Sequence, residues 1–253
     1  MPTETIAFLV FIALFTVAIV AVAVVRGRKL AAHEEELSRG ASARGWKFES
    51  FKKGGYRIQR YHGDTDGVEW VAESLVNMAS NRSRHREVKI ARWHGRWSPG
   101  VNTPIVCFGL DKGVEAPEFP SAEGGGFFAR MVQKAAGYAF DVTLDKLFGE
   151  EAGAEVDAAT LRPVGVTLDG FIVMASNEGE AKRVFSDSLE RALRDGMNQA
   201  GSVLAQDNRP SVLIQPKGIS LARTEQIQTI NELEQFIKAG VGLTRAFKFG
   251  RRA

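Results

Sequence analysis

The feature that most constrains this chain is an uncharged apolar run from Ile6 to Val25. Of its twenty residues, fourteen are Ile, Leu, Val or Phe, five are Ala and one is Thr. A helix that rises about 1.5 Å per residue carries such a run across roughly 30 Å, the thickness of the hydrocarbon core of a bilayer. The run therefore predicts a single transmembrane helix, with the lipid bilayer as its first partner.

The flanks of this run predict its orientation. Arg26, Arg28 and Lys29 follow it directly, whereas the residues before it carry Glu4 and no basic side chain. Basic residues beside a membrane span tend to stay in the cytoplasm. We therefore expect the amino terminus outside and the rest of the chain inside, with the three basic side chains in contact with anionic headgroups.

A cleaved secretory signal is the alternative interpretation of the same run, because Ala21-Val22-Ala23 offers a cleavage site of small residues. Signal peptides, however, have a positively charged amino-terminal region and a shorter apolar core. This sequence has neither. We therefore favour an uncleaved anchor that occupies residues 1–29, followed by a short helical stalk over residues 30–45.

More than 200 residues follow the anchor, enough for one large or two small domains with a core. The formal net charge of +3 is too small to argue for nucleic acid. The single cysteine, Cys107, lies in an apolar stretch and is expected to be a small buried side chain. One cysteine excludes an internal disulfide and a zinc site with several cysteines.

Residues 46–126 have the pattern of a mainly β region. Alternating or continuously apolar runs cover residues 56–62, 68–76, 87–93 and 105–110, and Asp66-Gly67 marks a tight turn between the first two. These four runs predict an antiparallel meander. Residues 111–126, which include two prolines and three consecutive glycines, predict a loop or a boundary.

A helical connection is expected over residues 127–160, and residues 161–253 predict a ββαββα unit with a basic tail. Its hairpins are residues 164–175, turning at Asp169-Gly170, and residues 211–222, turning at Pro216-Lys217-Gly218. Asn177 is expected to cap the first helix and Thr224 the second. The tail from Gly240 predicts a frayed terminus, with an interfacial segment as the alternative. The fold class is α+β.

A basic stretch with interleaved tryptophans is the most distinctive surface candidate. Its basic side chains could touch anionic lipid, bind a nucleic-acid backbone with Trp93 and Trp97 stacking on bases, or form a solvated hairpin. The anchor favours lipid over nucleic acid, because it already holds the chain near headgroups. The candidate contacts with an anionic surface are Arg82, Arg84, Arg86, Lys89, Arg92 and Arg96.

Other motifs give weaker signals, and we assign no catalytic residue, cofactor or metal ligand. His62-Gly63-Asp64-Thr65-Asp66 has metal-ligand residue types, but a tight turn is the favoured interpretation, and the twelfth position of an EF-hand would fall on Leu75. Gly124–Gly126 lacks the remaining residues of a phosphate-binding motif. Signatures of serine hydrolases, zinc proteases and kinases do not occur.

The layout of the sequence resembles uncharacterised bacterial single-pass membrane proteins. The resemblance rests on the Ile6–Val25 run with Arg26-Gly27-Arg28-Lys29, then Gly45-Trp46, Tyr61-x-Gly63 and Asp66-Gly67-x-x-Trp70. It implies a bacterial plasma membrane and a cytoplasmic α+β domain, and it supplies no catalytic residues.

Together these patterns predict a membrane-anchored scaffold or accessory module that binds a protein partner at the membrane surface. The alternative is a ligand sensor or an enzyme with a pocket around residues 111–126.

Overall fold

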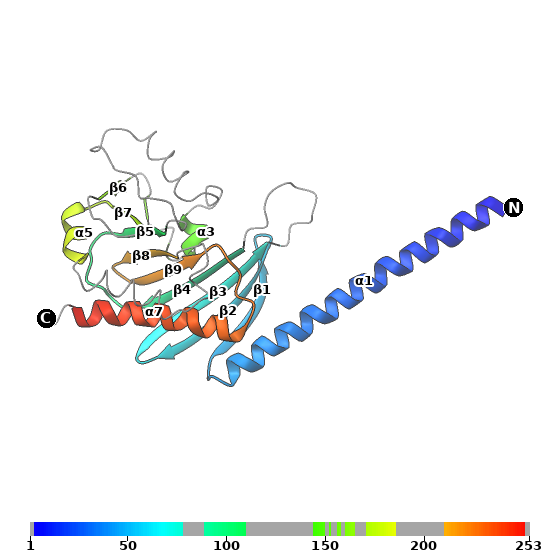
Figure 1. The fold of residues 1–253 in the computed structure, drawn as a ribbon, viewed down its shortest axis with the longest axis horizontal. Helices are drawn as coiled ribbons and strands as arrows, with labels where there is room; N and C mark the ends of the chain where they lie inside the picture. Colours follow the sequence, from blue (N-terminus) through cyan, green and yellow to red (C-terminus); the bar gives the residue numbers. More distant parts are fainter. Residues whose placement is uncertain are drawn as a thin grey trace.

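In the computed structural model, the chain forms a mixed α+β fold around one large antiparallel sheet, with a long helix that projects from it (Figure 1). The structure describes residues 3–77, 89–109, 144–149, 152, 156–157, 160–164, 171–185 and 210–250. The helix predicted after residue 127 and the loop of residues 111–126 lie outside these ranges. The expected α+β class is confirmed.

The long helix, α1 (Thr3–Ser42), joins the apolar run and the stalk in one continuous element. Gly27 and Gly40 lie inside it, and neither glycine interrupts the helix. The helix ends where Arg44 and Trp46 donate backbone hydrogen bonds back to Ala41, and Gly45 takes a positive φ of 74°. This tight reversal sends the chain directly into the sheet.

The predicted meander is present in its first part. β1 (Lys47–Lys53), β2 (Tyr56–Thr65), β3 (Val68–Asn77) and β4 (Lys89–Arg96) pair in sequence order, each antiparallel to the next. The β2–β3 turn lies at Asp66 and Gly67, both with positive φ, as the sequence predicted. The Asp64 carboxylate closes this turn by accepting a hydrogen bond from the Gly67 backbone N–H at 3.2 Å.

The fourth predicted strand does not continue that meander. β5 (Ile105–Gly109) pairs with β7 (Phe171–Ala175) and β8 (Ser211–Gln215), while β4 pairs with β9 (Gly218–Arg223). The sheet order is β1-β2-β3-β4-β9-β8-β5-β7-β6, with β6 (Arg162–Pro163) at the far edge. An apolar run shows that a strand is central but does not show which strands lie beside it.

Among the described residues of the carboxy-terminal part, the elements follow the expected order: β6, β7, α5 (Glu178–Val184), β8, β9 and α7 (Ile230–Gly250). Asn177 caps α5 as predicted, accepting a hydrogen bond from the Glu180 backbone N–H at 3.0 Å. The predicted Asp169-Gly170 turn lies outside the described residues. Because β5 lies between β7 and β8, strands of residues 46–126 and 161–253 share one sheet.

The last helix differs from the prediction at both ends. It begins after Thr229, whose side-chain oxygen accepts from the Glu232 backbone N–H at 3.2 Å, and not after Thr224. The residues predicted as a frayed tail continue this helix to Gly250, and Val241, Leu243 and Phe247 are buried. Leu243 and Phe247 are four residues apart and so share one side of the helix, and all three residues belong to the same core cluster.

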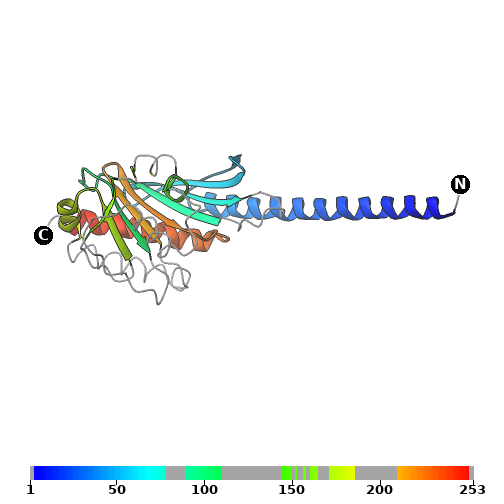
Figure 2. The same cartoon turned by 90° about the horizontal axis from the view of Figure 1, so that it is seen from above.

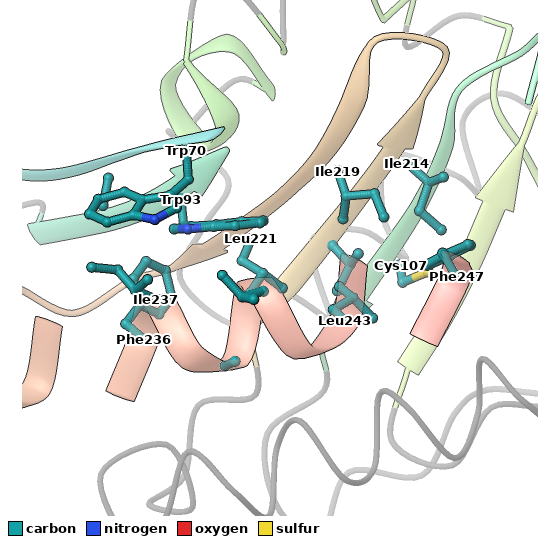
Figure 3. Packing of buried hydrophobic residues seen from close by; sticks show 14 of the residues in the cluster. Trp70, Trp93, Cys107, Ile214, Ile219, Leu221, Phe236, Ile237, Leu243 and Phe247 are labelled. Carbon is teal, nitrogen blue, oxygen red and sulfur yellow. The ribbon is translucent and has the colours of Figure 1, made fainter. Parts of the chain in front are cut away.

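Helices cover both faces of the sheet (Figure 2). On one face, here called the α7 face, Trp70, Trp93 and Leu221 pack with α7 and the end of α1 (Figure 3). On the other, the α3 face, Val106, Leu213 and Met174 pack with α3 (Leu144–Phe148) and with Ala152, Val156 and Leu161. Neighbouring residues such as Ile105 and Val106 belong to different clusters, because side chains alternate across a strand.

Gly240 and Gly242 provide a matched test of this packing. A Cβ at Gly240 would overlap the indole of the buried Trp93, whereas a Cβ at Gly242 meets nothing within 4 Å. Overpacking costs about 1–3 kcal/mol, and alanine is favoured over glycine inside a helix by about 1 kcal/mol. We expect Gly240→Ala to lower the free energy of unfolding and Gly242→Ala to raise it, measured by urea titration of the full chain in detergent. Equal effects would show that α7 does not pack on Trp93.

Candidate functional site

Between Phe15 and Val25, α1 exposes apolar side chains around its whole circumference. Phe15 is 60% exposed and Val17 65%, and Ile19, Val20 and Val22 are each more than half exposed. Successive residues turn by about 100° around a helix axis, so these side chains point in all directions. Among the residues with described side chains, no helix has the length and apolar character needed to cross a membrane. Side chains of Ile6 to Leu14, within the predicted span, are outside that set.

The basic flank of the apolar run lies on the same uninterrupted helix. Arg28 and Lys29 are exposed, as a contact with headgroups requires, and the side chain of Arg26 is not among those described. Glu34 comes nine residues after Val25 and therefore lies about 14 Å further along the helix axis.

The other half of α1 docks on the domain through small and apolar residues. Leu37 is 2% exposed and Ala41 is fully buried. At Gly40 the helix approaches α7 so closely that an added Cβ would lie 3.0 Å from Ile230 Cγ1. A larger residue at position 40 would therefore push the two helices apart.

Polar contacts fix the same junction at two levels of the helix. The Glu34 carboxylate accepts a hydrogen bond from the Ser50 hydroxyl at 2.8 Å and lies 3.4 Å from the Arg57 guanidinium. Beyond the helix end, Arg44 donates to Glu234 of α7 at 2.8 Å. The hydrogen bond from the Lys238 ammonium, one turn further along α7, and then that from the Arg44 guanidinium lower the pKa of the Glu234 carboxyl. Contacts at both levels hold α1 at a defined angle to the sheet.

The structure separates the predicted basic stretch into different places. Arg82, Arg84 and Arg86 lie outside the described residues. Lys89 begins β4 opposite Val76, whereas Arg96 ends β4 opposite Glu69 and Gly218. Arg96 follows Lys89 by seven residue steps, about 23 Å of extended strand, so these two cations lie at opposite ends of β4.

Arg92, between them, is part of an ion-pair cluster on the α3 face. The Glu73 carboxylate accepts from Arg60 Nε at 2.5 Å and also from Arg92 Nε, and the three residues stand in one cross-strand row. The Arg92 side chain is only 14% exposed, and Gly149, just after α3, lies over its guanidinium. Arg92 therefore has a structural role at this position, as an ion-pair partner of Glu73.

The tryptophans of the basic stretch belong to the core. Trp93 is fully buried beneath Gly240, and the partly buried Trp97 packs against the same cluster. The geometry therefore favours the interpretation that these tryptophans cover an edge of the core over the interpretation that they stack on bases. Sequence alternation alone could have suggested this, because Trp93 shares its face with Ala91.

His94 and Ser220 form the pair of side chains closest to nucleophile chemistry in the described part of the chain. His94 Nδ1 lies 2.9 Å from the Ser220 hydroxyl, and these residues are neighbours across β4 and β9. Ser220 is fully buried, so its hydroxyl is not presented to a substrate. The sequence did not indicate this pair, because 126 residues separate its members.

The sequence-predicted alternative of a metal at His62, Asp64 and Asp66 is not supported by the local geometry. Asp64 bonds to the backbone of its own turn, and Asp66 forms an ion pair with Arg245 of α7. Among the residues that the structure describes, no group of three or more His, Cys, Asp or Glu side chains is arranged to hold a metal ion. The favoured interpretation, a tight turn, agrees with these contacts.

A buried polar row lies under the start of α7. Gln59, Ser74 and Arg223 stand on the α7 face of neighbouring strands, and Ser74 Oγ accepts from the Ile227 backbone N–H at 3.3 Å. Burial lowers the pKa of the Arg223 guanidinium, with Glu225 and Glu232 acting in the opposite direction. Its planar group stacks on the Phe236 ring at 5.5 Å. The row ties β9 to α7 by a cation–π contact.

Two further buried ionisable side chains have shifted pKa values. Burial raises the pKa of the Cys107 thiol, so this side chain stays protonated and unreactive, as the sequence predicted for a buried cysteine. The Glu180 carboxylate is also buried, and burial acts to raise its pKa. The carboxylate accepts hydrogen bonds from the Thr103 side chain and from the backbone N–H groups of Asn102 and Thr103. These bonds, together with the charge of Arg183, lower the pKa overall. Glu180 thus attaches α5 to the segment before β5.

Comparisons with known proteins leave the family open. No protein-family model matches the chain, and no curated protein matches it. One solved structure, titled the crystal structure of the mycobacterial trehalose monomycolate transport factor A, TtfA, aligns with 10% sequence identity and a TM-score of 0.43. The alignment covers 85% of this chain and 92% of that one. A similarity at this level says nothing about what the present chain does.

Proposed function

We propose that this chain is a single-pass membrane protein in which α1 crosses a bacterial plasma membrane over Ile6–Val25. In this proposal the α+β domain is an accessory module that is held at the membrane surface and binds a protein partner there. The amino terminus lies outside and the domain lies in the cytoplasm.

The observation that supports the anchor is the exposure of apolar side chains on every side of α1 between Phe15 and Val25. A helix that is apolar all round needs an apolar environment on all sides, which a docking groove on one face does not provide. Each large apolar residue near the centre of a span contributes about 0.3–0.6 kcal/mol to insertion, so fourteen supply up to roughly 6 kcal/mol.

The continuity of α1 supports the position of the domain. The helix passes from the apolar run to its docked residues without a loop, and Glu34 contacts the sheet at Ser50. That contact lies about 14 Å beyond Val25. A domain held so near the headgroups is placed to meet the cytoplasmic surface of another membrane protein.

A binding role is supported by what the described polar groups do. The Arg60–Glu73–Arg92 cluster, the His94–Ser220 pair and Glu180 all bond to other residues of the fold. Each therefore has a structural role within the domain. The alternative, a sensor or enzyme with its pocket around residues 111–126, concerns residues that the structure does not describe.

The anchor is tested by replacing pairs of alanine residues in α1 with arginine. Arginine near the centre of a span costs about 2.5–3.5 kcal/mol per residue on insertion scales, so Ala13→Arg with Ala18→Arg should move the protein from carbonate-resistant membranes to the soluble fraction. Ala31→Arg with Ala32→Arg adds the same charge beyond the run and should leave the protein in membranes. A reporter fused at the carboxy terminus should be active in the cytoplasm. Retention of the first double variant, or periplasmic reporter activity, would contradict the anchor or its orientation.

Partner binding is tested by photocrosslinking in membranes. A photoreactive residue is placed in turn at Glu49, Glu69 and Lys182, which lie on β1, β3 and α5. We expect one discrete protein adduct that depends on the site and on an intact anchor, being retained in the Ala31/Ala32 control and lost in the Ala13/Ala18 variant. No adduct from any site, together with a saturable thermal shift with a nucleotide, metal or metabolite, would replace the scaffold with the ligand-sensing alternative.

A further inference from the structure

We propose that residues 224–229, which join β9 to α7 and are here called the strap, open away from the sheet and make the Arg223 guanidinium available to a carboxylate of the protein partner. In the closed state the carboxylate that faces Arg223 is that of Glu225, within the strap. This inference rests on the proposed function, because it names the chemistry of the partner's contact. It adds an autoinhibitory contact that the partner has to displace.

The strap crosses the α7 face from β9 to β3. It begins after Arg223, the last residue of β9, and four residues later the Ile227 backbone N–H donates to Ser74 Oγ of β3 at 3.3 Å. Strand register places Arg223 opposite Ala91 of β4, and Ala91 opposite Ser74. Neighbouring strands lie about 4.8 Å apart, so the strap spans two strand spacings, across the position of Ala91.

Arg223 is buried beside the strap without the hydrogen bonds that a buried guanidinium requires. Its side chain is 2% exposed, and neither Nε nor Nη1 has a hydrogen-bond acceptor among the described residues. Buried polar groups in native proteins are nearly always paired, because an unpaired group loses its hydration without compensation. The Phe236 ring at 5.5 Å replaces part of that hydration. Closing the strap is therefore unfavourable at Arg223, and opening it returns the guanidinium to water.

Glu225 offsets the charge of Arg223 without bonding to it. Glu225 Oε2 lies 4.0 Å from Arg223 Nη1, which is the outer limit of an ion pair and too long for a hydrogen bond. The Glu225 side chain is 44% exposed, so water screens this attraction. A carboxylate at about 2.8 Å forms a charge-assisted hydrogen bond, roughly twice as strong as a neutral one. An Asp or Glu of the partner can make the bond that Glu225 does not make.

A second acidic residue, Glu232, is committed to the start of α7. Burial has the largest effect on the pKa of Arg223 and lowers it, while Glu225 and then Glu232 raise it. The Glu232 carboxylate accepts from the Gln228 backbone N–H at 2.8 Å, and its own N–H donates to the Thr229 side chain. These bonds keep the first turn of α7 together. They leave Glu225 as the carboxylate that moves with the strap.

Ile227 is the attachment of the strap to the sheet. Its side chain is 1% exposed in the core of the α7 face, and its backbone bond to Ser74 is long. A segment without helix or strand that is held by few contacts opens at a lower free energy than the sheet around it. Exchange of the Ile227 backbone N–H therefore reports the opening of the strap.

Hydrogen exchange of the full chain in detergent tests this opening with two matched arginines. Arg223→Met removes a buried charge that lacks hydrogen bonds, so Ile227 exchange should slow by about fivefold or more. Arg92→Met, on the neighbouring strand β4, removes an arginine that donates to Glu73 and should lower the melting temperature. Faster exchange of Ile227 in Arg223→Met would overturn the proposal, because Arg223 would then stabilise the closed strap.

The other member of the ion pair should have the opposite effect. Glu225→Gln removes the charge that offsets Arg223 in the closed state, so Ile227 exchange should become faster by about twofold or more. Two members of an ordinary structural ion pair would both speed exchange when substituted. An unchanged rate in Glu225→Gln would show that Glu225 does not hold the strap closed, and would overturn the autoinhibitory contact.

A fluorescent peptide of six glutamates with blocked ends is the probe for carboxylate binding. By fluorescence anisotropy, Glu225→Gln should bind it about fivefold or more tighter than the unsubstituted chain. Adding Arg223→Met should remove this gain. Glu49→Gln changes the net charge equally on the exposed strand β1 and should leave binding unchanged. Equal gains from Glu225→Gln and Glu49→Gln, or no binding in Glu225→Gln, would overturn the carboxylate site.

Photocrosslinking in membranes separates this inference from the proposed function. We expect the partner adduct to be lost in Arg223→Met and retained in Glu49→Gln. An adduct of full yield in Arg223→Met would overturn the carboxylate contact and leave the binding role in place. Absence of any adduct in the unsubstituted chain, with the peptide still bound through Arg223, would overturn the partner at the membrane while the strap and its carboxylate site remain.

Discussion

The antiparallel docking of α1 against β1 determines how the rest of the molecule is placed. Burial of Leu37 and Ala41, the close approach of Gly40 to Ile230 and the contacts of Glu34 with Ser50 and Arg57 act over about two turns of helix. Because the helix continues without interruption from these contacts into the apolar run, a rotation of the domain requires either bending α1 or breaking its packing. The direction of α1 therefore determines the orientation of the domain.

The two faces of the sheet differ in the kind of side chains that they carry. Its α7 face is a large apolar core centred on Trp70 and Trp93, into which the last residues of α7 also pack. Its α3 face combines a smaller apolar cluster with the Arg60–Glu73–Arg92 ion pairs. Charged side chains within the sheet, such as Glu73 and Arg92, are thus used for internal contacts.

The sequence predicted local elements well because local rules decide them. The Asp66-Gly67 turn, the Asn177 cap and the β8–β9 hairpin depend on residues within a few positions of one another. Predictions failed where distant packing decides the outcome. β5 is inserted between two later strands, Thr229 replaces Thr224 as the helix cap, and the supposed tail becomes helical because Leu243 and Phe247 find a core. The basic stretch was read as one surface, yet strand length alone places Lys89 and Arg96 far apart.

The central claim, that α1 is one rigid helix from the bilayer to the sheet, is tested most directly by hydrogen exchange of the full chain in lipid vesicles. The backbone N–H groups of residues 26–42 should show continuous protection, including those around Gly27, where a hinge would be easiest to form. Fast exchange confined to residues 26–32, with protection on either side, would contradict the account, because the domain would then be free to turn on a flexible linker.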